Sequence, residues 1–254
     1  MRVRLPGIVL TEILGQTGPT PVEKIGYLLT ADFLPSSISE LAALAGVSRK
    51  LVAKACSNLA RLGWMAMTES AHSLRPVALI PPYCQERMGK ALKACYEVAG
   101  NRGEFLMKRC LDLLVRSEEF VDNARPRFLT NPTTGEPLEY DRYYLQGVAF
   151  EYNGAQHYET TGNYRDEKTL GEAKSRDLVK EALSTRKGVI LVTITSDDLD
   201  PATLAKLLPA SLLLNTVFPD GEYFQVLSEI CGAYRAAAAR YVPRVQQSQP
   251  GTKK

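Results

Sequence analysis

The sequence LEYDRYYLQGVAFEYNGAQHY, residues 138–158, decides the fold expected for this chain. Its aromatic and β-branched residues predict two short strands, Leu138–Tyr144 and Val148–Tyr152. The three residues between them end in Gly147, and a three-residue loop with Gly in the left-handed conformation makes a tight hairpin. This hairpin is therefore the expected centre of a β-containing domain.

Two carboxylates meet in that hairpin. Counting inward from a three-residue loop places Asp141 opposite Glu151. Opposed residues have β-carbons about 5 Å apart, so like charges there repel each other. A divalent cation would offset the repulsion, and Mg²⁺ is commonly held by one or two protein carboxylates together with water and phosphate oxygens. A two-residue turn would instead place Glu151 on the opposite face, as a solvated charge.

Three more polar residues accompany this pair. Gln156 and His157 follow the second strand at once, and Glu104 begins a predicted amphipathic helix, Glu104–Val115. A Glu in a first helical turn can simply complement the helix dipole. A lone His, one of two in the chain, is more often packed or solvent-facing than catalytic. Each of these residues therefore has a structural as well as a functional interpretation.

The pattern EYDRYY…FEYNGAQHY resembles the core of the PD-(D/E)XK nuclease superfamily, in particular its very-short-patch-repair-like and homing-endonuclease-like branch. The resemblance implies an α/β restriction-endonuclease-like core with a mixed central sheet. It also implies that Glu104, Asp141 and Glu151 hold Mg²⁺ or Mn²⁺ for phosphodiester hydrolysis.

The chain departs from the family's motif at one position. Where the motif reads Glu-x-Lys, this sequence reads Glu151-Tyr152-Asn153, so the lysine that helps orient the attacking water is missing. In the resembled branch a downstream Gln or His takes that neighbourhood, which Gln156 and His157 match. His157 is then the candidate base or proton shuttle.

The rest of the C-terminal half supports an α/β core. We expect a short basic strand at Arg125–Phe128, a mobile loop at Glu159–Ala173, a helix at Ser175–Thr185, a buried strand at Val189–Ile194, and helices at Pro201–Asn215 and Glu222–Tyr241. Lys180 is expected on the exposed side of its helix. The candidate phosphate contacts in this half are Arg127, Lys168 and Arg176.

The N-terminal part predicts three helices, Val22–Phe33, Ile38–Ala45 and Arg49–Leu62, and then a hairpin of Trp64–Thr68 and Pro76–Ile80. Ser48 is the predicted N-cap of the third helix and Gly63 its C-terminal stop.

The run SISELAALAGVSRKLVAKACSNLARLGWM resembles bacterial winged-helix domains. In that fold the third helix enters the major groove, which makes Arg49, Lys50 and Lys54 candidate DNA contacts, with Arg75 on the hairpin. The alternative is a solvated face on a protein-binding module, because a fold alone does not fix a function.

Composition is compatible with this arrangement. The net charge of +3 permits a nucleic-acid partner without requiring one. Five Cys without regular spacing and two His argue against a disulfide scaffold or a structural zinc site, and Cys95 is expected to pack as a small reduced hydrophobe. No apolar run is long enough for a membrane span, and the N-terminus is a poor signal peptide. We therefore expect a cytoplasmic protein.

We thus expect an α+β protein with a winged-helix domain at 1–82, a linker helix at 83–102, a restriction-endonuclease-like domain at 103–241 and a disordered tail at 242–254. The predicted function is metal-dependent cleavage of DNA, most simply double-stranded, by a protein that forms a homodimer or joins a larger DNA-processing complex. Two alternatives stay open. One is a catalytically inactive nuclease fold that binds DNA, and the other is a transcriptional regulator whose C-terminal domain senses a small ligand.

Overall fold

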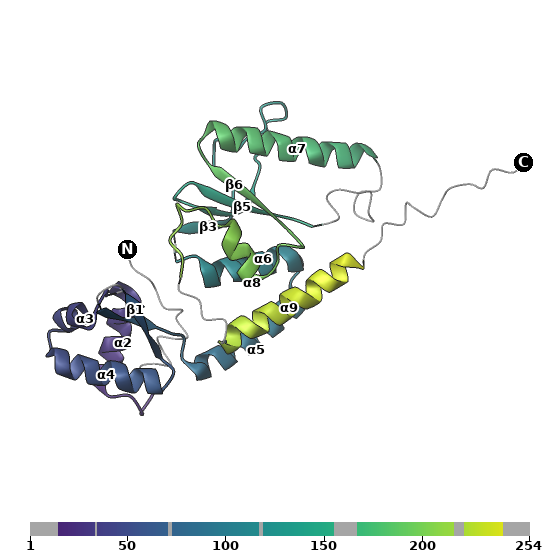
Figure 1. Cartoon of the computed structure of the whole chain (residues 1–254). Coiled ribbons are helices and arrows are strands. Elements are labelled where there is room, and N and C mark those ends of the chain that lie inside the picture. Colours follow the sequence, from purple (N-terminus) through teal and green to yellow (C-terminus); the bar gives the residue numbers. More distant parts are fainter. Residues whose placement is uncertain are drawn as a thin grey trace, which may run out of the picture. The chain divides into compact units, whose positions relative to one another are not determined.

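The computed structural model describes residues 15–33, 35–70, 73–116, 119–154, 167–215 and 221–240. The chain contains both helices and a mixed sheet, as expected for the α+β class. It divides into two compact units (Figure 1). The first comprises Met1–Ala94 with Phe218–Gln225, and the second Cys95–Val217 with Val226–Lys254.

The first unit has the predicted order of three helices and a hairpin. Its elements are α2 (Pro21–Phe33), α3 (Ile38–Ala45), α4 (Arg49–Arg61), β1 (Met65–Ser70) and β2 (Ser73–Ala78). Ser48 caps α4 by accepting a hydrogen bond from the Leu51 N–H. Gly63 has a φ of 72°, which Gly adopts more readily than other residues and which ends the helix as predicted.

An aromatic core fixes this unit. Tyr27 and Trp64 meet edge to face with ring centroids 5.6 Å apart, and both are buried with Leu41 and Leu59. The hairpin is longer than expected, because the antiparallel ladder continues through Thr68 opposite Arg75. Arg75 therefore belongs to a strand and not to the connection between strands.

Helix α5 (Pro82–Val98) follows almost as predicted. Pro82 stands at its first position, where the missing N–H costs no hydrogen bond. The boundary between the two compact units falls inside this helix, between Ala94 and Cys95. Cys95 is exposed, so the expectation that it packs in an apolar surrounding was wrong.

The second unit is built on a four-stranded sheet in the order β3-β4-β5-β6. Its elements are α6 (Arg102–Leu114), β3 (Phe120–Ala124), β4 (Tyr140–Tyr144), β5 (Val148–Asn153), α7 (Glu167–Arg186), β6 (Ile190–Thr195), α8 (Pro201–Leu204), a 3-10 turn at Ala205–Leu207 and α9 (Glu222–Ala239). Strands β5 and β6 are parallel and the other pairs antiparallel, so the sheet is mixed as predicted. Helix α7 lies along one face of the sheet, and α6 and α8 lie on the other (Figure 1).

The central hairpin has the predicted register. Tyr144 lies opposite Val148, and Gly147 has a φ of 81° in the three-residue loop. Tyr144 and Phe150 are buried against each other with centroids 5.9 Å apart. The three-residue loop, and not the two-residue alternative, is therefore present.

Four predicted elements of the second unit differ from the structure. The strand expected to be buried, Val189–Ile194, is the edge strand β6, in which Ile190 is 48% exposed. The strand at the other edge is Phe120–Ala124 and not Arg125–Phe128, because Pro126 cannot donate to a ladder and its carbonyl instead accepts from Leu129 in a turn. Helix α7 begins at Glu167, so part of the predicted loop is helical. The helix expected from Pro201 to Asn215 ends within two turns, before Pro209.

Residues 159–166 of the predicted loop and the predicted tail, 242–254, lie outside the described residues. Among the helices that the structure describes, none has the length and apolar character needed to cross a membrane.

Arg142 of β4 is a buried cation that binds two acids of the second unit. Its side chain is 1% exposed and is bound by Asp112 of α6 and Asp122 of β3 at 2.6 and 2.7 Å. Its guanidinium also lies 4.0 Å from the Phe120 ring centroid. These two acids, which are about a third exposed, are therefore engaged by the buried Arg142, and the neighbouring Asp141 is left for another role.

Candidate active site

Three carboxylates of the second unit interact in what we call the acid cluster, Glu104, Asp141 and Glu151. Glu104 comes from the first turn of α6, Asp141 from β4 and Glu151 from β5. The negative charge of Glu104 acts on Asp141, and that of Asp141 acts on Glu151. Asp141 is thus within range of the charges of both other acids.

Asp141 is fixed by a backbone hydrogen bond. The described β4–β5 ladder ends at Arg142 opposite Phe150, so Asp141 and Glu151 lie just beyond its last pair. There the Tyr152 N–H donates to Asp141 Oδ2 at 2.7 Å. The carboxylate therefore serves as the acceptor for a strand N–H and is held at the point where the two strands separate.

Glu151 is paired with a lysine from another element. Lys180 of α7 is 8% exposed and donates to Glu151 Oε1. The expectation that Lys180 is exposed was wrong, because Lys180, Leu183 and Ser184 share the buried face of α7. Ser184 also meets the Tyr140 hydroxyl, which anchors this face of α7 to β4.

Glu104 is oriented from both sides. Its N–H is capped by Asn101 Oδ1, and its Oε2 accepts from Asn101 Nδ2 at 3.0 Å. Its Oε1 accepts from Lys108, one turn further along α6. The dipole interpretation of Glu104 therefore holds in part, since the residue does lie in a capped first turn, but its carboxylate also belongs to the acid cluster.

Gly103 allows α6 to approach the sheet. A β-carbon at this position would lie 2.2 Å from the ring of Tyr152, far inside van der Waals contact. The Tyr152 hydroxyl is in turn 2.9 Å from that of Tyr234 on α9. Tyr152 also supplies the N–H that binds Asp141. The close approach of α6 to Tyr152 therefore brings Glu104, the residue after Gly103, toward Asp141.

Burial controls the charge of the cluster. It raises the pKa of Asp141 to about 6, and the charge of Glu104 adds to this, while Lys180 and Lys108 oppose it. Burial likewise raises the pKa of Glu151 to about 7, opposed by Lys180 and reinforced by Asp141. Desolvation and like charges both favour the protonated acid. An added positive charge would therefore favour the deprotonated form of both acids.

The residues present fit a hard divalent cation in part. Glu151 Oε2 is buried without a hydrogen-bond partner, and such an orphaned carboxylate oxygen is costly unless a cation or donor reaches it. Oxygen ligands of this kind suit Mg²⁺ or Mn²⁺. Within the described ranges, however, no group of three or more His, Cys, Asp or Glu side chains is arranged as a metal site by itself. Asp141 and Glu151 are thus the residues that would hold the ion, with Glu104 beside them.

Of the other residues predicted for this site, the structure describes the side chains of Arg127 and Arg176. Gln156 and His157 lie outside the described residues, as does the side chain of Lys168. Arg176 is half exposed and pairs with Glu136 at 3.0 Å. Arg127 is exposed in the turn that follows β3.

The basic residues predicted for DNA contact lie in the first unit. Arg49, Lys50 and Lys54 are all exposed on α4. Arg75 is half buried, and its Nε is buried without a hydrogen-bond partner. The three α4 residues are therefore accessible to a ligand, whereas Arg75 is partly occupied with packing.

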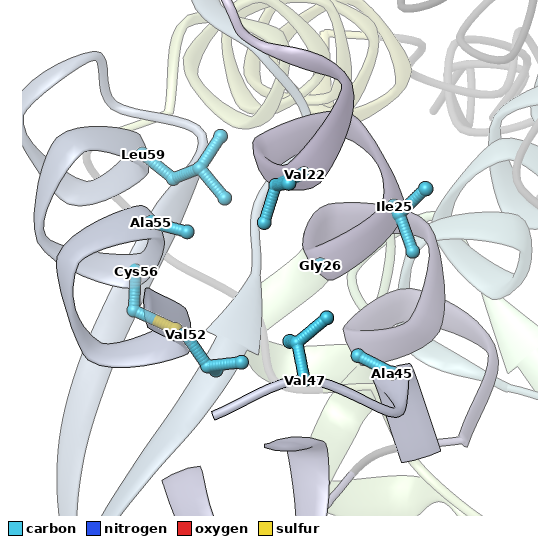
Figure 2. A pocket seen from close by; sticks show the side chains of 9 residues that line it. All are labelled: Val22, Ile25, Gly26, Ala45, Val47, Val52, Ala55, Cys56 and Leu59. Carbon is cyan, nitrogen blue, oxygen red and sulfur yellow. The ribbon is translucent and has the colours of Figure 1, made fainter. Parts of the chain in front are cut away.

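The first unit also contains a small apolar cavity of about 40 Å³ (Figure 2). The lining side chains come from α2, the turn after α3 and α4, and include Val22, Val47, Val52 and Leu59. Its lining is apolar throughout, so it offers no group for chemistry and is a gap in packing between helices.

Sequence reasoning missed Lys108, Asn123 and Lys180 as members of the site. Lys108 could have been found as the i+4 partner of Glu104 on a predicted helix. Asn123 precedes the recognisable hairpin and carries no pattern. Lys180 lies in the noted run R-D-x-x-K, but the polar face of a helix was assumed to be its solvent face.

Comparisons with known proteins give little further guidance. No family model matches the chain, and no solved structure matches it. Over 113 residues, 42% of this chain, it is 34% identical to the uncharacterized protein 033L of Invertebrate iridescent virus 3. The match spans 57% of that viral protein's length.

Proposed function

We propose that the second unit is a metal-dependent endonuclease of the PD-(D/E)XK type that hydrolyses phosphodiester bonds in DNA. The first unit, in this proposal, is a winged-helix module that binds double-stranded DNA through α4. The observation that carries the proposal is the pairing of Lys180 with Glu151, next to Asp141. It supplies, from α7, the ammonium group that the sequence lacks two residues after Glu151.

Each residue of the cluster has a role in this reaction. Asp141 and Glu151 would hold the ion with Glu104 beside them, and the Tyr152 N–H keeps Asp141 in place. A bound Mg²⁺ or Mn²⁺ would lower the pKa of a water molecule and offset charge that develops on the phosphate. Lys180 orients the attacking water or donates to the phosphate oxygens, as expected of a preorganised cation in a buried site.

The same pairing weakens the catalytically inactive alternative. That alternative rested on the missing lysine, and a buried lysine in contact with Glu151 removes this argument. The charge on the buried Lys180 also has a cost, which its contact with Glu151 offsets. The ligand-sensing alternative requires a pocket in the C-terminal domain, and it gains no support from the small cavity, because that cavity is lined by residues of the first unit.

The test is Mn²⁺ binding by isothermal titration calorimetry, with the full chain at pH 7.5. Wild type should bind Mn²⁺, and Asp141→Asn should bind it far more weakly. The Asp112→Asn variant is the matched control, because Asp112 is an acid of the same unit that binds Arg142. If wild type shows no heat of Mn²⁺ binding at millimolar concentrations, the metal-dependent proposal is wrong.

A further inference from the structure

A second lysine, Lys108, reaches the acid cluster from the side opposite Lys180. Lys108 lies in α6, and its side chain is 11% exposed. Its ammonium donates to Glu104 Oε1 and, at 2.9 Å, to Asn123 Oδ1. Burial of a lysine without good partners is expensive, so these two acceptors determine where the ammonium lies.

Asn123 is held in an unusual backbone conformation. Among the described residues it is the non-glycine residue with positive φ, at 54°. Asn tolerates this left-handed region better than most residues. The β3–β4 ladder pairs Asp122 with Arg142 and Ala124 with Tyr140, and it omits Asn123, which falls opposite Asp141 in that register. The positive φ of Asn123 therefore occurs next to Asp141, a member of the acid cluster.

The side chain of Asn123 is fixed at both of its polar atoms. Its oxygen accepts from Lys108, and its nitrogen donates to Glu139 Oε1 at 3.1 Å. Glu139 is itself bound by Arg125 at 2.7 Å. An amide with an acceptor on one side and a donor on the other can point only one way. The amide oxygen of Asn123, an exposed residue, thus points toward Lys108.

We propose that Lys108 and Asn123 form a positioning pair for Glu104. Asn123 aims the Lys108 ammonium, and the ammonium holds the Glu104 carboxylate toward Asp141. Neither residue touches the substrate in this account, and both act through Glu104. The inference rests on the proposed function, because it assumes that Glu104 contributes to cation binding.

The geometry gives a variant that separates positioning from folding. Asn123→Gly keeps the positive φ, which Gly adopts without steric cost, and removes both side-chain hydrogen bonds. Lys108→Met removes the ammonium and keeps the apolar stem. Loss of a residue that orients a ligating carboxylate typically weakens metal binding by about 10–100-fold.

The experiment is Mn²⁺ calorimetry on the full chain, with wild type, Asn123→Gly and Lys108→Met, each also in a Glu104→Gln background. We expect the two variants to lose at least about tenfold in Mn²⁺ affinity, and to lose nothing further once Glu104 is replaced. Asn123→Gly should melt close to wild type.

Other outcomes overturn the inference. Unchanged affinity would mean that the pair is structural, and tighter binding would mean that Lys108 only competes with the ion for Glu104. An equal loss in both backgrounds would mean that the pair acts without Glu104. Absence of Mn²⁺ binding by wild type would instead reject the proposed function, and the positioning role with it.

Discussion

Lys180 on α7 donates a hydrogen bond to the carboxylate of Glu151 on β5, 29 positions earlier in the chain. The two side chains are 10% and 16% exposed. Their contact joins the helix on one face of the sheet to the strand that carries Glu151. It also places a cation beside the two carboxylates that share the end of the central hairpin.

We therefore expect the replacement of Lys180 to reduce DNA cleavage strongly in a protein that still folds. We expect Lys180→Met to reduce DNA cleavage by roughly 10²-fold or more, the usual effect of removing one preorganised donor. Breaking a buried ion pair costs roughly 3–5 kcal/mol. The loss of stability should be smaller at or below pH 7, because Glu151, with a pKa of about 7, can take up a proton and so lose the charge that Lys180 no longer offsets.

Single-turnover cleavage and chemical denaturation of the same preparations measure these two effects. The Lys187→Met variant is the control, since Lys187 is an exposed residue just beyond the end of α7. Full cleavage by Lys180→Met would remove this lysine from the reaction.

Gly103 allows a second test, of how α6 reaches the sheet. We expect Gly103→Ala to destabilise the protein by about 1–3 kcal/mol, because the new methyl group overlaps the Tyr152 ring. Cleavage should fall too, since Tyr152 and Glu104 both move. Gly100→Ala is the matched control, because no atom lies within 4 Å of a β-carbon built there. Thermal unfolding of the two variants compares them, and equal melting temperatures would contradict the close contact.

The raised pKa values of the cluster predict how stability depends on pH. In the folded protein they lie at about 6 for Asp141 and about 7 for Glu151, above ordinary values of 3.8 and 4.5. Between about pH 4 and 7 the folded state therefore binds more protons than the unfolded state. The contribution of these two acids to the free energy of unfolding consequently decreases as pH rises through this range. A bound cation needs the deprotonated acids, so Mn²⁺ should stabilise increasingly as pH rises.

Melting curves at pH 5 to 8, with and without Mn²⁺, measure this dependence. Asp141→Asn should melt no lower than wild type without metal, because it removes a repulsion and its carbonyl oxygen can still accept from Tyr152. Glu151→Gln should melt lower, because Lys180 then lacks its carboxylate. A metal shift independent of pH would contradict the involvement of these two acids.

The hairpin register could be predicted from the sequence because it depends on neighbouring residues, whereas Glu104 was singled out by the resemblance to the nuclease family. Gly147 favours a three-residue loop, and that loop alone sets Asp141 against Glu151. Lys180 could not be placed in the same way. Its partner is distant in the chain, and whether a polar helical residue is buried depends on tertiary packing.

The errors in the second unit have local causes. The strand Phe120–Ala124 reads FVDNA, with too few β-branched residues to be recognised. Its one acid, Asp122, and its one amide, Asn123, are bound by Arg142 and Lys108 from other elements. Asn123 in particular breaks the strand pattern, and it does so beside the candidate site, where such exceptions are common.

The first unit should contribute affinity for DNA and no chemistry. We expect Arg49→Ala combined with Lys50→Ala to weaken DNA binding and to reduce the slope of log K against log salt by about one per lost phosphate contact. Lys90→Ala combined with Lys93→Ala removes the same charge from exposed positions of α5 and is the control. Fluorescence anisotropy across a salt titration gives both numbers. Identical slopes for both variants would point to a protein-binding module.

The most direct test of the account is cleavage of a labelled DNA duplex by the purified full chain in the presence of Mg²⁺ or Mn²⁺. The account predicts that wild type cleaves, that a chelator stops cleavage, and that Asp141→Asn, folded and equally stable, does not cleave. It would be contradicted if the DNA stays intact with wild type and both cations, or if Asp141→Asn cleaves as fast as wild type.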